Sequence, residues 1–111
     1  MSEKRNYLVL VAASIDTAQV VRGARERLIS DVDANAATLW VDSKGLGIFV
    51  STVLSASEVW ESAVGGKAMP FEVLKDVLVV EVGKDWATRR ETKTEHWLVT
   101  HSGWPSRHLA G

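Results

Sequence analysis

The chain has 111 residues, 46% of them hydrophobic and 24% charged, which is typical of one globular domain spanning residues 1–111. Cysteine is absent, so a disulfide scaffold, a thiolate metal site and a cysteine nucleophile are excluded. The formal net charge of −1 gives no overall attraction to nucleic acid or to an anionic membrane.

The hydrophobic residues are not arranged as a membrane anchor. No apolar run approaches the ~20 residues that a spanning helix needs, so no membrane span is predicted. The N-terminus is polar, and the apolar run behind it, from Tyr7 to Ala13, is short for a signal peptide and leads into a helical pattern. We therefore expect a cytoplasmic protein.

The first expected element is a strand over residues 7–13, with the sequence YLVLVAA. A continuous apolar run rich in β-branched residues is typical of a central strand that is covered on both faces. A helix should follow, with Ser14 as its N-cap and Asp16 in its first turn. Its apolar positions recur at steps of three and four residues as far as Val32.

Three more strands are expected. Residues 38–41 and 46–53 flank four turn-forming residues and so predict a hairpin. Residues 77–82, with the sequence VLVVEV, follow a linker at residues 67–70 and end at Gly83. Together with the first strand, these segments can form a four-stranded sheet.

The second helix has a clear start and end in the sequence. Ser55 and Glu58 match a capping box, in which the serine hydroxyl accepts from the Glu58 N–H and the Glu58 carboxylate reaches back to the start of the helix. Gly65 and Gly66 should end this helix.

The segment after Gly83 leaves two alternatives open. Residues 94–101, TEHWLVTH, have the residue types of a strand. They also fit a helix that begins near Thr88 or Thr92 and is closed by Gly103. From about residue 103 we expect a flexible tail.

The expected order of elements is strand, helix, strand, strand, helix, strand. This βαββαβ order predicts an α+β fold with the ferredoxin-like split βαβ arrangement and an extra C-terminal element. Both helices then cover one face of the sheet, so the open face must be polar, covered by the C-terminal segment, or buried against another subunit. Five tryptophans are many for this length, and tryptophan is enriched where protein surfaces meet. We therefore expect a homodimer, with a monomer closed by its own C-terminal segment as the alternative.

Two parts of the chain resemble a known family. Residues 76–87, DVLVVEVGKDWA, are similar to the fourth-strand block of small bacterial proteins described as SinR-like, which are relatives of VapD and of CRISPR-associated protein two. Residues 47–52, GIFVST, followed by residues 54–59, LSASEV, resemble the strand-then-helix step of that family. The element order matches over about residues 7–101. The resemblance implies a ferredoxin-like homodimer and makes nucleic acid a candidate partner.

One position departs from the nuclease members of that family, which carry a metal-binding aspartate at the end of the first strand. Here this position falls at Ala12-Ala13, and alanine has no oxygen to offer to Mg²⁺. Asp16 lies three residues further on, where a role at the start of the helix accounts for it. We therefore expect no catalytic residues and no nuclease chemistry.

Motifs for metals and nucleotides are also missing from the sequence. The histidines are His96, His101 and His108. The spacing of the first two places them on different faces of either a helix or a strand, and no cysteine completes a ligand set. No GxxxxGK[ST] or GxGxxG motif occurs. We expect no metal, no nucleotide and no other cofactor.

One cluster of basic and aromatic residues is a candidate nucleic-acid site, and it consists of Lys84, Trp86, Arg89, Arg90 and Lys93. A tryptophan face can stack on a base while arginine and lysine contact phosphates. Arg22 and Arg25 could extend this patch. However, Asp85, Glu91 and Glu95 lie among the basic residues and nearly cancel their charge. This pattern favours a solvated, ion-paired segment with Trp86 packed at the edge of the sheet.

The sequence therefore favours a non-catalytic, dimeric interaction or regulatory module. The alternatives are a metal-dependent endonuclease and a nucleic-acid-binding protein of the type of VapD and CRISPR-associated protein two. The residues at Ala12-Ala13 argue against the first alternative, and the nearly neutral charge argues against the second.

Overall fold

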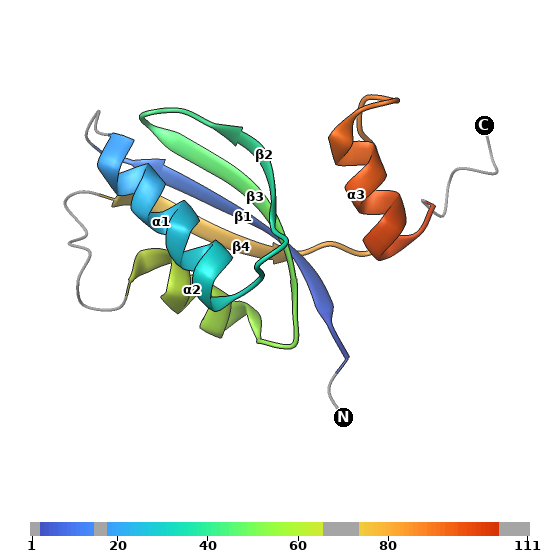
Figure 1. The fold of residues 1–111 in the computed structure, drawn as a ribbon, viewed down its shortest axis with the longest axis horizontal. Helices are drawn as coiled ribbons and strands as arrows, with labels where there is room; N and C mark the ends of the chain where they lie inside the picture. The colour runs from blue at the N-terminus through green and yellow to red at the C-terminus, as the bar shows by residue number, and fades with distance from the viewer. Residues whose placement is uncertain (1–2, 15–17, 66–73, 105–111) are drawn as a thin grey trace.

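The computed structural model describes residues 3–14, 18–65 and 74–104 (Figure 1). Asp16, Gly66, the expected linker at residues 67–70, His108 and the tail from residue 105 lie outside the described residues. Within them the elements are β1 (Arg5–Ala13), α1 (Ala18–Asp31), β2 (Ala37–Val41), β3 (Gly45–Thr52), α2 (Ala56–Val64), β4 (Leu74–Glu81) and α3 (Lys93–Ser102). No helix in these segments has the length and apolarity needed to cross a membrane.

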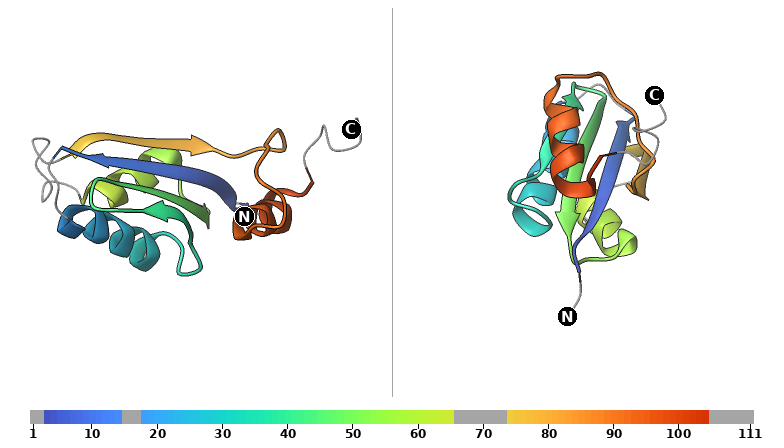
Figure 2. Two further views of the ribbon diagram at one scale, coloured as in Figure 1. Left: turned by 90° about the horizontal axis from the view of Figure 1, so that it is seen from above. Right: turned by 90° about the vertical axis from the view of Figure 1, so that its right-hand side faces the viewer.

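The four strands form one sheet in the order β2-β3-β1-β4, and each neighbouring pair is antiparallel. The helices α1 and α2 pack side by side on one face of this sheet (Figures 1 and 2). The fold is therefore α+β, and its βαββαβ order is the predicted ferredoxin-like arrangement. The helix α3 is the extra C-terminal element and lies at one end of the sheet (Figure 2).

The two faces of β1 are buried to different extents. Tyr7, Val9, Val11 and Ala13 are buried under the two helices, whereas the residues between them are only partly buried. Further buried residues of this core are Val21, Ala24, Leu28, Leu46, Ile48, Val50, Val59 and Ala63. The prediction that β1 is central is confirmed, but the prediction that it is covered on both faces is wrong. Its apolar run reflects a second face that is itself apolar yet only partly covered.

The capping box that begins α2 is present as predicted. The Ser55 hydroxyl accepts a hydrogen bond from the Glu58 N–H at 3.2 Å, and Glu58 Oε1 accepts one from the Ser55 N–H at 3.0 Å. The helix ends at Gly65, whose φ of 74° suits glycine. Arg27 of α1 donates hydrogen bonds to the carbonyls of Ser62 and Ala63, so it connects the two helices where α2 ends.

The C-terminal segment is a helix, with the ends that the helical alternative proposed. The Thr92 hydroxyl caps it by accepting from the Glu95 N–H, and Gly103 follows its last turn. Trp97 stacks on Phe49 of β3 with ring centroids 4.9 Å apart. Asn6 of β1 donates to the His101 carbonyl at 3.0 Å. The helix α3 is thus fastened to the face of the sheet that α1 and α2 leave open.

The stack that holds α3 leaves one polar atom without a partner. Trp97 is buried, and its Nε1 has no hydrogen-bond partner within the described residues. The Trp97 ring also stacks on His101, with centroids 4.1 Å apart. Aromatic stacking therefore dominates the attachment of this side chain.

On the same face of the sheet, Trp40 of β2 lies flat against β3. A Cβ atom added at Gly47 would overlap the Trp40 ring atoms Cζ3 and Cε3. Trp40 is the register partner of Gly47. The pairing of β2 with β3 is irregular between Thr38 and Trp40, so Leu39 has no register partner in β3. Glycine at position 47 is therefore needed for the indole to approach the strand closely.

We expect Gly47→Ala to lower the free energy of unfolding by about 1–3 kcal/mol, because the indole must move to admit the methyl group. Urea denaturation measures this difference. Gly83→Ala is the matched control, since among the described residues no atom beyond its two chain neighbours lies within 4 Å of a Cβ added there. Equal urea midpoints for the two variants would show that the close approach of Trp40 to β3 does not require glycine at position 47.

The capping box also predicts a pH dependence. The Ser55 backbone N–H, with a smaller contribution from its side chain, holds the pKa of Glu58 below its ordinary value. The stabilisation is therefore complete above the ordinary pKa of glutamate and is lost as the pH falls through the lowered pKa.

We expect Glu58→Gln to be less stable than the unaltered protein at about pH 7 and to approach it in stability near about pH 2.5. Urea midpoints across this range measure the convergence. Glu61→Gln on the same helix is the control for a change of charge alone. A stability difference for Glu58→Gln that stays constant with pH contradicts the assignment.

Candidate functional site

The open face of the sheet carries an apolar surface that we call the open-face patch, formed by Leu10, Ala12, Trp40, Leu78 and Val80. The register places it, because Leu10 of β1 has Gly47 and Leu78 as partners in β3 and β4. Side chains of such partners lie on the same face of a sheet. Trp40, Leu78 and Val80 are 43%, 49% and 39% exposed.

The helix α3 covers only one end of this face. Its Trp97 and Leu98 form a small core with Phe49, against which Leu8 and Ala37 pack. The open-face patch begins where that core ends, since Leu8 is the register partner of both Phe49 and Val80. Covering by the C-terminal segment, the alternative to a homodimer, therefore applies to one end of the sheet, and an apolar surface remains next to it.

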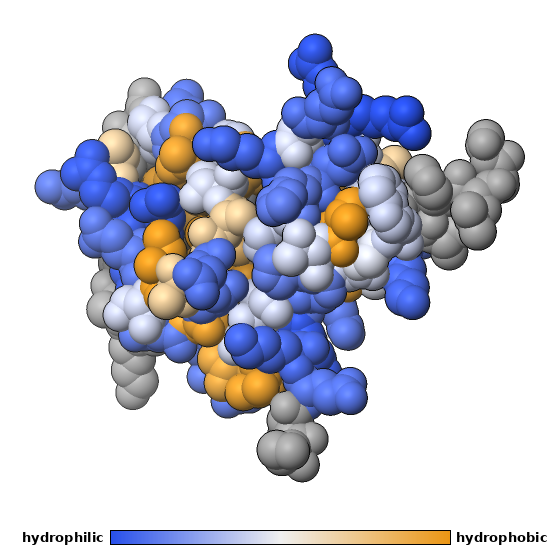
Figure 3. Space-filling view, turned by 45° about the vertical axis from the view of Figure 1, so that its right-hand side comes forward, coloured by the Kyte–Doolittle hydropathy of each residue, from blue (hydrophilic) through white to orange (hydrophobic). Residues whose placement is uncertain are grey.

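Figure 3 shows one side of the molecule, turned so that the end with α3 comes forward. There, hydrophilic side chains dominate, and apolar residues form separate small groups. The open-face patch instead joins residues of β1, β2 and β4 across the sheet. Scattered exposed apolar residues are ordinary, whereas apolar neighbours on one flat face mark an interaction surface.

Sequence reasoning missed the role of Trp40 in this surface. The structure places its ring over Gly47 and within 3.7 Å of a Cβ added at Gly45. Glycines two residues apart lie on one face of a strand, so the spacing of Gly45 and Gly47 was the signal for a flat site that an aromatic ring could cover.

The five residues of the candidate nucleic-acid site are not equally accessible. Lys84, Arg89, Arg90 and Lys93 are exposed. Trp86 is half-buried, packs against the Phe49–Trp97–Leu98 core, and donates its indole N–H to the Gly103 carbonyl at 3.2 Å. Trp86 thus connects the segment after β4 to the end of α3, which accounts for a tryptophan at this position without a ligand.

The arginines of α1 lie elsewhere. Arg25 donates its Nε–H to the Thr38 hydroxyl at 3.0 Å, on the helix-covered side of β2. Arg22 and Arg25 line a hollow of about 470 Å³ there, together with Thr38 and Ser43. The helix α3 packs on the opposite face of the sheet, so these arginines do not extend the Lys84–Lys93 segment.

The positions considered for metal chemistry are also separate from one another. His96 is exposed, while the His101 Nδ1 lies 2.9 Å from the Trp97 carbonyl oxygen. One further carboxylate lies near the Ala12 position, since Asp76 is the register partner of Ala12, and its Oδ1 accepts the Val77 N–H at 2.9 Å. Within residues 3–14, 18–65 and 74–104, no three histidine or carboxylate side chains are grouped so that they could hold a metal ion.

Comparisons of the chain with protein-family models, with curated proteins and with solved structures gave no match. The resemblance of residues 47–59 and 76–87 to the SinR-like family therefore stays a prediction. The function has to be argued from the surfaces of this chain.

Proposed function

We propose that the protein is a non-catalytic interaction module that forms a homodimer through the open-face patch. The observation that carries the proposal is the exposure of Trp40, Leu78 and Val80 on one flat side of the sheet. Transfer of apolar surface out of water contributes about 25 cal/mol per Å². A surface of this kind is stabilised when a second apolar surface covers it.

A second copy of the chain suits this surface for two reasons. Sheets pack face to face at about 10 Å, and the close approach of Trp40 to Gly47 keeps the patch flat enough for such packing. The net charge of −1 produces little repulsion between two copies. In a two-fold dimer the same patch serves both subunits, so no further complementary surface is required.

The two alternative functions have less support. An endonuclease of the type discussed above needs a metal ligand where this chain has Ala12-Ala13. Nucleic-acid binding through the Lys84–Lys93 segment would use Trp86 as a stacking platform. That indole N–H already bonds to the Gly103 carbonyl, and the ring packs against the Phe49–Trp97–Leu98 core.

Mass measurement by light scattering on a sizing column tests the dimer. We expect the unaltered protein to be a dimer at micromolar concentrations and Leu78→Lys to weaken its dimerisation at least about tenfold, because the lysine charge would be buried at the interface. Val53→Lys is the control, since Val53 is 55% exposed and lies outside the patch, after β3. A monomeric mass for the unaltered protein, or equal dimerisation of the two variants, contradicts the proposal.

The nucleic-acid alternative has a separate test. We expect labelled RNA and DNA to show no salt-sensitive change in fluorescence anisotropy between about 50 and 200 mM salt when the protein is added. Arg89→Ala combined with Arg90→Ala then changes nothing. Binding that weakens with salt, and that loses part of its salt dependence in the double variant, would instead assign the Lys84–Lys93 segment to nucleic acid.

A further inference from the structure

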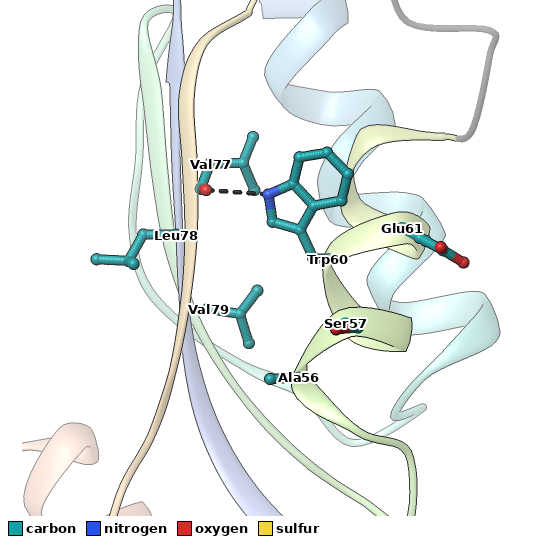
Figure 4. Close-up of a pocket in the computed structure, with 7 residues that line it drawn as sticks. All are labelled: Ala56, Ser57, Trp60, Glu61, Val77, Leu78 and Val79. Atoms are coloured by element: carbon teal, nitrogen blue, oxygen red, sulfur yellow. Dashed lines mark hydrogen bonds between the residues drawn. The ribbon is translucent and has the colours of Figure 1, made fainter.

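A groove separates α2 from the outer edge of β4, away from the open-face patch (Figure 4). Its volume is about 400 Å³, and it is lined by Ala56, Ser57, Trp60, Glu61, Val77, Leu78 and Val79. Figure 4 shows Trp60 and the two valines pointing into the space between helix and strand, whereas Leu78 points to the other side of the sheet. The groove and the open-face patch thus share Leu78, but its side chain points away from the groove and toward the surface proposed for dimerisation.

The outer edge of β4 presents backbone groups to this groove. Among the described strands, β4 lies at the end of the sheet and pairs with β1 alone. The Val82 N–H donates to the Asn6 carbonyl at 2.7 Å, which marks these two as a hydrogen-bonded pair. Bonded and non-bonded pairs alternate along an antiparallel ladder. Val77, Val79 and Glu81 are therefore in non-bonded pairs with β1, and their N–H and C=O groups point outward.

Of the three residues with outward backbone groups, only Val77 has these groups hydrogen-bonded by other described residues or side chains of the chain. The Val77 N–H donates to Asp76 Oδ1 at 2.9 Å, and the Val77 carbonyl accepts from Trp60 Nε1 at 3.1 Å. No side chain of the described residues bonds the backbone of Val79 or Glu81 in this way. Two adjacent outward positions, with four hydrogen-bonding groups, thus have no partner among the described residues and lie beside an apolar groove.

We infer that this groove binds an extended, basic peptide segment of a partner protein, which adds a strand to the edge of β4. The peptide backbone pairs with Val79 and Glu81. One apolar side chain of the peptide enters the space beside Trp60 and Val79, and a lysine or arginine reaches Glu61. Main-chain pairing supplies affinity and the groove selects side chains, as in other cases of strand addition.

Charge selects a basic peptide. Glu61 is the one charged side chain among the described residues that line the groove. Next to the groove, beyond the start of α2, a second hollow is lined by Glu3, Glu58 and Glu81 together with Lys4 and Arg5. Each of these two hollows carries an excess of one carboxylate. A further hollow that shares Trp60 and Val77 with the groove is lined by Lys75 and Asp76, whose charges cancel. The balance favours a cationic partner over an anionic one.

The same charges disfavour a second copy of β4 as the occupant. If two β4 edges paired with Val79 opposite Val79, then Val77 of each copy would lie opposite Glu81 of the other. The backbone groups of Val77 are already bonded within the chain, so only the Val79 pair could form hydrogen bonds. Pairing of Val79 with Glu81 of the second copy avoids this, but it gathers both Glu81 and both Glu58 side chains around the two-fold axis. Like charges that meet across a sheet are destabilising. A peptide brings neither the bonded Val77 nor the carboxylates.

The test uses the full chain and two capped synthetic peptides of about six residues, one alternating valine and lysine, the other valine and glutamate. Amide exchange and chemical shifts are followed by NMR. We expect the lysine peptide to bind and to slow exchange of the Val79 and Glu81 amides, and the glutamate peptide not to bind. Binding without protection at Val79 overturns strand addition, as does failure of the lysine peptide to bind.

Variants separate the contributions. Glu61→Lys should weaken binding of the lysine peptide about two- to fivefold, as expected for an exposed ion pair, whereas Glu26→Lys on α1 should not. Trp60→Phe frees the Val77 carbonyl and should strengthen binding. Equal affinities for both lysine variants would remove the role of Glu61.

The outcome is independent of the proposed dimer. Leu78 faces away from the groove, so Leu78→Lys should alter the mass and leave protection of the Val79 amide by the lysine peptide unchanged. Protection of this amide in the protein alone, rising with protein concentration, would instead indicate pairing between two β4 edges and overturn the peptide proposal.

Discussion

The structure depends on one geometric constraint, which is that a strand presents alternate side chains to two faces while the two crossover helices cover only one. Strand–helix–strand crossovers are right-handed, so both helices of a βαββαβ chain fall on the same side of the sheet. In β1 this separates Tyr7 and Val9, which are buried, from Leu8 and Leu10, which are only partly buried. The two surfaces proposed to bind partners lie where the chain leaves the second face of the sheet and the outer edge of β4 only partly covered.

The two ends of the second face differ in how they are covered. At one end, Trp97 of α3 stacks on Phe49 and closes the sheet with residues of the same chain. At the other, the Trp40 ring lies on Gly47 and stays partly exposed. The outer edge of β4 is also divided, because Trp60 and Asp76 bond Val77 but leave Val79 open. An edge strand whose backbone groups are bonded along only part of its length can pair with another strand at the remaining positions.

Local signals predicted the elements that local chemistry determines. The capping box of Ser55 and Glu58 and the glycine at position 65 marked both ends of α2, and the βαββαβ order followed from the apolar segments. The C-terminal segment stayed ambiguous, since residues 94–101 suit a strand or a helix and the choice depends on contact with Phe49. The bond from Trp60 to the Val77 carbonyl has no signature in the chain either, because it depends on where β4 lies relative to α2.

The buried indole N–H of Trp97 has a consequence for the dynamics of the protein. A buried donor without an acceptor costs about 1–3 kcal/mol, which offsets part of what the aromatic stack contributes. The helix α3 packs in a cluster separate from the central core, so its local opening would leave that core intact. Its release would hydrate that N–H and uncover Phe49 and Leu8 beside the open-face patch. The area of sheet available to a partner is thus linked to the stability of a single short helix.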